Sequence, residues 1–134
     1  MVLLRFRAWH KTWEEMGKVK RIRFDDDGNV TTVLFVGKTL GVNAKIDEFE
    51  LMQSTGLFDK NGKEIFEGDI LAFETDEGIL NVNIYWDSKH ALFMFKSEKY
   101  NEEELLAELV ENNTYPFEIV GNIHENPELL EVTK

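Results

Sequence analysis

The side chains that carry out most enzyme chemistry are absent or scattered in this sequence of 134 residues. Cysteine is absent, which excludes thiolate nucleophiles, thiolate metal ligands and disulfides. The three histidines, His10, His90 and His124, stand at no spacing typical of a metal site. Glu67 and Asp69 are the pair to test for acid–base catalysis, but among 26 acidic residues such pairs arise by chance. No catalytic residue, metal ligand or cofactor is therefore predicted, and the chain is expected not to be an enzyme.

Two short motifs resemble ligand-binding loops without completing them. Residues 25–29 (DDDGN) begin like a calcium loop, but the alternating ligands are missing, as is the terminal Glu that would fall near Val36. Residues 37–39 (GKT) match the end of a phosphate-binding loop. The preceding glycine, Gly28, lies nine positions upstream of Gly37 instead of the five that this loop requires. Both motifs are predicted to be turns or loops beside strands.

Basic residues gather at the start of the chain. Residues 1–24 hold seven Lys or Arg against two Glu, a balance of +5, so the remainder sums to −16 and the whole chain to −11. The residues predicted to contact nucleic acid or a partner are Arg5, Arg7, Lys18, Lys20, Arg21 and Arg23. With Trp9 and Trp13 nearby, this set has the ingredients of a nucleic-acid surface, where cations meet phosphates and rings stack on bases.

The acidic remainder of the chain argues against nucleic acid, because carboxylates repel phosphates within a Debye length of about 8 Å. Three functions stay open. The leading hypothesis is a non-catalytic protein that works by protein–protein contact or self-assembly, in which the basic strands of one copy meet the acidic surface of another. The second is a nucleic-acid-binding module that uses the basic strands. The third is an acidic mimic of DNA that inhibits a DNA-binding protein of the host.

The elements that would hold the basic residues are predicted as short strands. Residues 4–9 alternate apolar and polar side chains, which is typical of a half-buried strand. Residues 18–24 and 30–36 are predicted to pair as a hairpin, because the turn at 25–29 between them is rich in Asp and contains Gly and Asn. The stretch 37–44, with two Gly and an Asn, is predicted as a loop.

The second half of the chain is predicted to contain more strands and one helix. Between residues 64 and 96, three or four short strands joined by tight turns predict an antiparallel meander that closes toward a small barrel. A helix is predicted over residues 101–112, because Asn101 suits an N-cap, three Glu follow it, and leucines form a stripe. Residues 117–123 are predicted as the last strand. The predicted fold class is therefore mainly β with one α-helix.

Three segments carry the most specific pattern in the sequence. They are residues 6–9 (FRAW), residues 51–70 (LMQSTGLFDKNGKEIFEGDI) and residues 117–130 (FEIVGNIHENPELL). In this order and at this spacing they resemble the YopX family, small proteins encoded by phages and prophages of low-GC Gram-positive bacteria. The resemblance implies N-terminal strands followed by an SH3-like barrel in the C-terminal part. No activity is established for that family, so the resemblance implies no catalytic residues.

Composition sets the remaining expectations. A chain that is 43% hydrophobic and 12% aromatic at this length is expected to form a single domain, with N-terminal strands over residues 1–46 and the barrel part over 47–134. No apolar run approaches the roughly 18 residues of a membrane span, and the N-terminal apolar stretch is too short for a signal peptide. The protein is therefore expected in the cytoplasm of a bacterial host, without a membrane partner. Its protein partner is not identified by the sequence, and a homo-oligomer fits the opposed charges.

Overall fold

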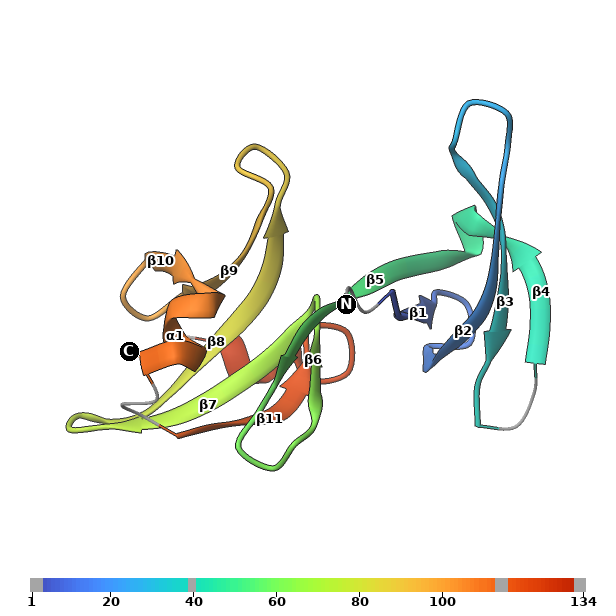
Figure 1. Cartoon of the computed structure of the whole chain (residues 1–134). Coiled ribbons are helices and arrows are strands. Elements are labelled where there is room, and N and C mark those ends of the chain that lie inside the picture. The colour runs from blue at the N-terminus through green and yellow to red at the C-terminus, as the bar shows by residue number, and fades with distance from the viewer. Residues whose placement is uncertain (1–3, 39–40, 113–115, 132–134) are drawn as a thin grey trace. The chain divides into compact units, whose positions relative to one another are not determined.

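The computed structural model describes residues 4–38, 41–112 and 116–131, and the chain divides into two compact units, Leu3–Ser54 and Thr55–Lys134. Each unit contains antiparallel sheet (Figure 1). Each unit also has its own apolar core. The boundary between the units falls inside one strand, β5 (Phe49–Phe58). The predicted fold class, mainly β with one α-helix, is confirmed for the described part of the chain.

The first unit is a meander of four antiparallel strands, and β5 extends its sheet by pairing with β1. Its other elements are β1 (Phe6–His10), β2 (Glu15–Phe24), β3 (Val30–Val36), β4 (Gly41–Lys45) and the short 3₁₀ helix η1 (Ile46–Glu48). The strand order is β4-β3-β2-β1-β5, and every pair is antiparallel. The predicted hairpin across residues 25–29 is confirmed, because β2 pairs with β3 on either side of that turn. The predicted loop at 37–44 is wrong from Gly41 onward, because these residues pair with β3 as β4.

The core of the first unit is small and aromatic. Ala8, Val33, Phe35 and Phe49 are buried in one cluster. The buried ring of His10 joins this cluster, stacking on Trp13 at 4.1 Å and meeting Phe49 edge-on at 5.2 Å. Its Nδ1 accepts a hydrogen bond from the backbone N–H of Trp13 at 3.0 Å. His10 therefore fixes the turn between β1 and β2, which is a structural role.

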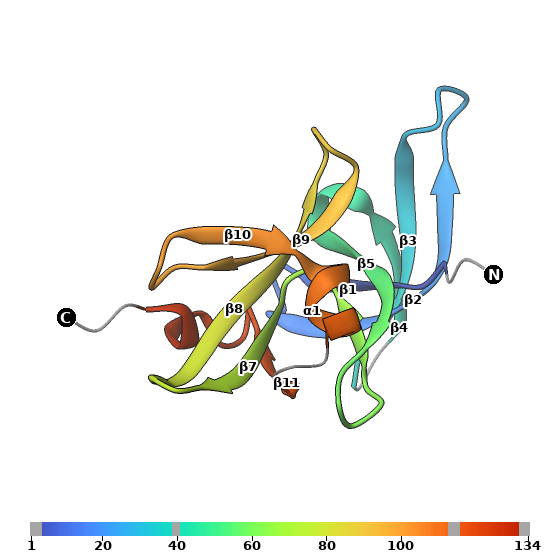
Figure 2. The ribbon, with the colours of Figure 1, turned by 60° about the vertical axis from the view of Figure 1, so that its left-hand side comes forward.

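The second unit is a meander that the last strand closes. Its elements after β5 are β6 (Glu64–Phe66), β7 (Asp69–Thr75), β8 (Gly78–Asp87), β9 (Leu92–Ser97), β10 (Glu102–Leu105), α1 (Leu106–Asn112), β11 (Phe117–Asn122) and η2 (Pro127–Leu130). Five of these strands form a sheet in the order β10-β9-β8-β7-β11, in which β8 lies between β7 and β9 (Figure 2). Its core contains Leu71, Val82 and Ile84 from the sheet and Leu106 from α1. None of the helices in the described ranges has the length and apolar character needed to cross a bilayer.

The predicted helix over residues 101–112 is wrong in its first part. Asn101 is not an N-cap, since its φ of 51° places it in a turn. Residues 102–105 pair with β9 as β10, and the α-helix begins only at Leu106. The pairing with β9 satisfies the backbone groups on one side of β10, and the fully buried Leu106 follows directly, so tertiary packing outweighs the local helix-start signal.

Candidate functional site

The strand register of the first unit gathers cations on one side of its sheet. Residues directly opposite each other on antiparallel strands share a face, and every second residue of a strand shares it too. We call the resulting set the basic face. It consists of Arg7, Lys18, Arg21, Arg23 and Lys45. Four of these five were predicted as contact residues from the sequence.

A β-bulge in β2 puts the two arginines on this face. Lys18 lies opposite Val36, and Val36, Leu34 and Thr32 alternate along β3, so they share a face. The partners of Leu34 and Thr32 are Arg21 and Arg23, because the register shifts by one residue between Val19 and Arg21. Without that shift, strict alternation would place residues 20 and 22 beside Lys18. The extra residue of a bulge reverses which side chains face the core, and this reversal is not visible in the sequence pattern.

Lys45 was missed because its strand was predicted as a loop. Thr32 of β3 lies between Arg23 on one side and Lys45 on the other, so the three residues form one row across the sheet. The signal in the sequence was the alternation of Val42 and Ala44 on the core side of β4. Two glycines and an asparagine nearby masked that signal.

Four of the five cations of the basic face make no ion pair with a described carboxylate. Within the described residues, Lys18, Arg21, Arg23 and Lys45 are exposed and make no ion pair within 4.0 Å. The one acidic side chain that the register places on this face, among the positions described, is Glu50, opposite Trp9. Glu50 is already paired with Lys11 at 3.9 Å. The positive charge of Lys18, Arg21, Arg23 and Lys45 is therefore not offset by an ion pair among the described residues.

Half-buried apolar side chains lie between the cations. They are Met16, Leu34 and Val36, together with Trp9. Trp9 lies opposite Met16 on the basic face, whereas Trp13 stacks on His10 and takes no part in the face. The surface thus alternates charge with aliphatic area.

Two of the predicted contact residues lie outside the paired rows. Lys20 is the extra residue of the bulge, and its side chain is exposed. Arg5 precedes β1, and its backbone carbonyl accepts a hydrogen bond from the N–H of Ser54 at 2.8 Å. A contact between any of the six predicted residues and a partner stays a prediction.

The second unit carries the opposite charge. Residues 55–134 contain 18 Asp or Glu against six Lys, whereas residues 3–54 contain eight acidic against nine basic residues. Three of the acidic residues occupy consecutive exposed positions on β10, the end strand of its sheet, and we call them the acidic edge. They are Glu102, Glu103 and Glu104.

Two tyrosines close to carboxylates of the second unit have raised pKa values. Burial raises the pKa of Tyr85 above its ordinary value, and the charge of Glu103 raises it further. The hydroxyl of Tyr100 donates a hydrogen bond to Glu77 at 2.6 Å, which raises the pKa of Tyr100, and Glu102 adds to the effect. Both tyrosine pKa shifts are in the direction that nearby carboxylates produce.

The residues considered for catalysis and metal binding have structural contacts. Asp69 is 2% exposed, and its Oδ2 accepts a hydrogen bond from the N–H of Phe66 at 2.8 Å. The Oδ1 of Asp25 accepts hydrogen bonds from the N–H groups of Asp27 and Asn29, as expected for a turn between strands. Among the described residues, no group of three or more His, Asp or Glu could hold a metal ion. Residue 39 of the GKT motif lies outside the described residues.

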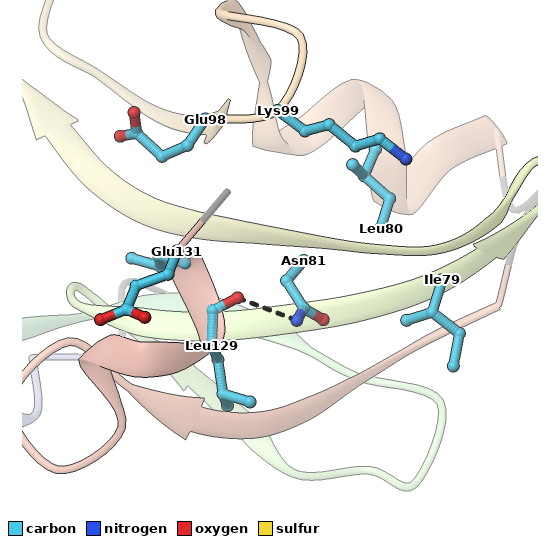
Figure 3. A pocket seen from close by; sticks show the side chains of 8 residues that line it. Ile79, Leu80, Asn81, Glu98, Lys99, Leu129 and Glu131 are labelled. Carbon is cyan, nitrogen blue, oxygen red and sulfur yellow. Dashed lines mark hydrogen bonds between the residues drawn. The ribbon is translucent and has the colours of Figure 1, made fainter. Parts of the chain in front are cut away.

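A pocket of about 260 Å³ lies on the second unit between β8, η2 and the turn after β9 (Figure 3). The side-chain amide of Asn81 donates to the carbonyl of Leu129 at 3.0 Å and so ties η2 to β8. Of the charged groups that line the pocket, Glu98 and Lys99 point in opposite directions. These side chains do not converge on a point where a substrate atom could sit.

Comparison with known proteins places the whole chain in one family. The sequence model described as YopX protein matches residues 5–131. The solved structure of protein EF1440 from Enterococcus faecalis is similar over 98% of this chain and 100% of that chain, with 30% identity and a TM-score of 0.68. Protein yopX from Bacillus subtilis is similar over 97% of this chain and 98% of that chain, with 19% identity and a TM-score of 0.64. No curated protein matches the sequence.

Proposed function

Because the chain belongs to the YopX family, for which no activity is established, we propose that it is a non-catalytic accessory protein that works by protein–protein contact. The proposal includes an origin in a phage or prophage and a place of action in the cytoplasm of the bacterial host. One observation carries it. The register of β1 to β4 brings five cations onto one face of the first unit, and four of them have no ion-pair partner among the described residues.

An acidic protein surface suits this face. Unpaired cations on a surface raise the local concentration of anionic partners and orient them during encounter. Arg21 and Arg23 can each bind a carboxylate through two parallel N–H···O bonds, which lysine cannot do. Leu34 and Val36 supply apolar area between the charges, as the centres of protein interfaces require.

Nucleic acid is the second candidate, and Trp9 is the observation that favours it. Its ring shares the basic face with Arg7 and Lys18, so a base could stack on it while phosphates meet the cations. Single-strand binders use successive exposed rings, and the other half-buried side chains on this face are aliphatic. These aliphatic neighbours favour a protein over a nucleic acid. The idea of an acidic DNA mimic stays a prediction.

The test compares two anionic probes of equal charge, a glutamate-rich peptide and a single-stranded oligonucleotide, by fluorescence anisotropy. The wild-type chain is expected to bind the peptide, and the double variant Arg21→Gln/Arg23→Gln is expected to bind it roughly tenfold more weakly, since exposed charge pairs contribute up to about 1 kcal/mol each. The control Lys60→Gln/Lys89→Gln removes two exposed cations of the second unit and should leave binding unchanged.

If the variant Arg21→Gln/Arg23→Gln binds the peptide as tightly as the control Lys60→Gln/Lys89→Gln does, the basic face is not the contact surface. Tighter binding of the oligonucleotide than of the peptide, weakened further by Trp9→Ala, would replace the protein partner with nucleic acid.

A further inference from the structure

We propose that the partner of the basic face is a second copy of the same chain, which docks through its acidic edge. This inference rests on the proposed function and names its partner. Each chain then carries a donor surface on one unit and an acceptor surface on the other. The contact is heterologous, because the two surfaces differ, and it joins copies head to tail.

The charge division between the units is the first argument. The negative charge of the chain belongs to residues 55–134, whose 18 acidic and six basic residues sum to −12, while residues 3–54 sum to +1. Within the first unit the cations are sorted onto one face by the register of β2. A surface of each sign is therefore present in every copy, at high local density.

The accessibility of the acidic edge is the second argument. β10 is the end strand of its sheet, so it is paired on one side, with β9. Its three glutamates are exposed, and none makes an ion pair within 4.0 Å with a described cation. Lys96, which lies opposite Glu103, is instead within 3.9 Å of Glu98. The carboxylates of Glu102 and Glu104 are thus available to cations from another molecule.

The spacing of the charges is the third argument. Arg21 and Arg23 stand two residues apart on one strand, and Glu102 and Glu104 stand two residues apart on another. Side chains at this separation point to the same face and lie about 7 Å apart. Two arginine–carboxylate pairs can therefore form at once when β10 lies along β2 of another copy. Two simultaneous pairs fix the register of the contact as well as its orientation.

The experiment uses two variants that each block one surface. Arg21→Gln/Arg23→Gln removes charge from the basic face, and Glu102→Gln/Glu104→Gln removes it from the acidic edge. Sedimentation velocity is measured over a range of concentrations after nuclease treatment. Wild-type chains are expected to form species larger than a dimer, and raising the salt to about 1 M, where screening acts within about 3 Å, should dissociate them.

Mixing the two variants gives the sharpest outcome. Each variant alone is expected to be monomeric, whereas an equimolar mixture forms a heterodimer and nothing larger, because one intact face meets one intact edge. The controls Lys60→Gln/Lys89→Gln and Asp26→Asn/Asp76→Asn change the same numbers of charges at other exposed positions and should assemble like the wild type. Circular dichroism checks that every variant keeps its fold.

A wild-type chain that is monomeric at every concentration overturns this inference, and so does assembly that persists in either blocking variant. The proposed function is judged separately by the peptide titration. Monomeric chains that bind the acidic peptide through Arg21 and Arg23 would reject the second copy and keep a different acidic protein as partner. Chains that neither assemble nor bind the peptide would reject both.

Discussion

The two units contain the same five-residue turn, at residues 25–29 in the first and 59–63 in the second. In both, the N–H of the leading aspartate donates to the carbonyl four residues later at 2.9 Å. The Oδ1 of this aspartate accepts hydrogen bonds from the N–H groups of the residues two and four positions later. Both distances are 2.9 Å for Asp25, and they are 2.9 Å and 2.8 Å for Asp59. The fourth residue is a glycine with positive φ, 85° at Gly28 and 78° at Gly62.

The two turns differ in what surrounds them. Asp25 is exposed and contacts residues of its own turn. Asp59 is 7% exposed, and its Oδ2 accepts a third hydrogen bond from the N–H of Ile119 in β11 at 3.0 Å. The first turn therefore closes a hairpin, whereas the second also ties the β5–β6 hairpin to the last strand. A local pattern specifies the turn, and its surroundings decide how much of the unit depends on it.

The largest difference between the two turns is expected when their leading aspartates are replaced, because the two variants should lose different amounts of unfolding free energy. Asp59→Ala leaves the N–H of Ile119 without its acceptor in a buried setting, which costs about 1–3 kcal/mol in the free energy of unfolding. Asp25→Ala frees N–H groups that water can reach, so the loss is smaller. Urea unfolding monitored by hydrogen exchange measures both, and the Asp59 variant should lose protection in β11. Equal losses in the two variants would mean that the bond to Ile119 contributes nothing.

Replacing the glycines of the two turns should instead cost the same unfolding free energy in both. Gly28→Ala and Gly62→Ala each force a residue with a side chain into the left-handed region, which costs on the order of 1 kcal/mol. A Cβ added at either position would meet nothing within 4 Å, so no steric clash adds to this cost. The two variants are therefore expected to destabilise the chain equally in thermal unfolding. A larger loss at Gly62 would show that the turn of the second unit is strained by its tie to β11.

The two turns also show which features of the structure can be predicted from the sequence. Preferences of Asp and Gly act within five residues, so both turns and the fold class follow from local chemistry. The strand β10 and the bulge at Lys20 depend on pairing with other strands. Local signals predicted a helix in place of β10, and they did not predict the bulge. The bond between Asp59 and Ile119 joins residues 60 positions apart, and no local pattern contains it.

The same reasoning applies to the candidate site. The sequence predicted that Arg7, Lys18, Arg21 and Arg23 matter together because they lie close in the chain. It did not predict their common face, since alternation alone would separate Arg21 and Arg23 from Lys18. A change of one residue in register decides whether these cations form one surface or two.

The smallest expected effect concerns pH. At acidic pH, replacing Asp59 and replacing Asp25 should change the free energy of unfolding by more similar amounts than at neutral pH. Burial works to raise the pKa of Asp59, but the N–H groups of Ile119, Lys63 and Asn61 outweigh it, so this pKa lies below its ordinary value of 3.8. The hydrogen bond from Asn29 is the largest of the effects that lower the pKa of Asp25. A carboxylate with a lowered pKa in the folded state stabilises the fold above its unfolded pKa, and this contribution is lost as the pH falls through the folded pKa.

The variants Asp59→Asn and Asp25→Asn test this at neutral pH and below pH 3.8, the ordinary value for an aspartate. At neutral pH the wild type should exceed Asp59→Asn in unfolding free energy by more than it exceeds Asp25→Asn, because a buried charged acceptor is lost only in the former. Below that pH both differences should shrink progressively as each carboxylate is protonated at its lowered folded-state pKa, since a protonated carboxyl and an amide offer the backbone similar acceptors. If the difference in unfolding free energy between the wild type and Asp59→Asn stays constant with pH, the shape of the side chain, and not its charge, holds β11 to the turn.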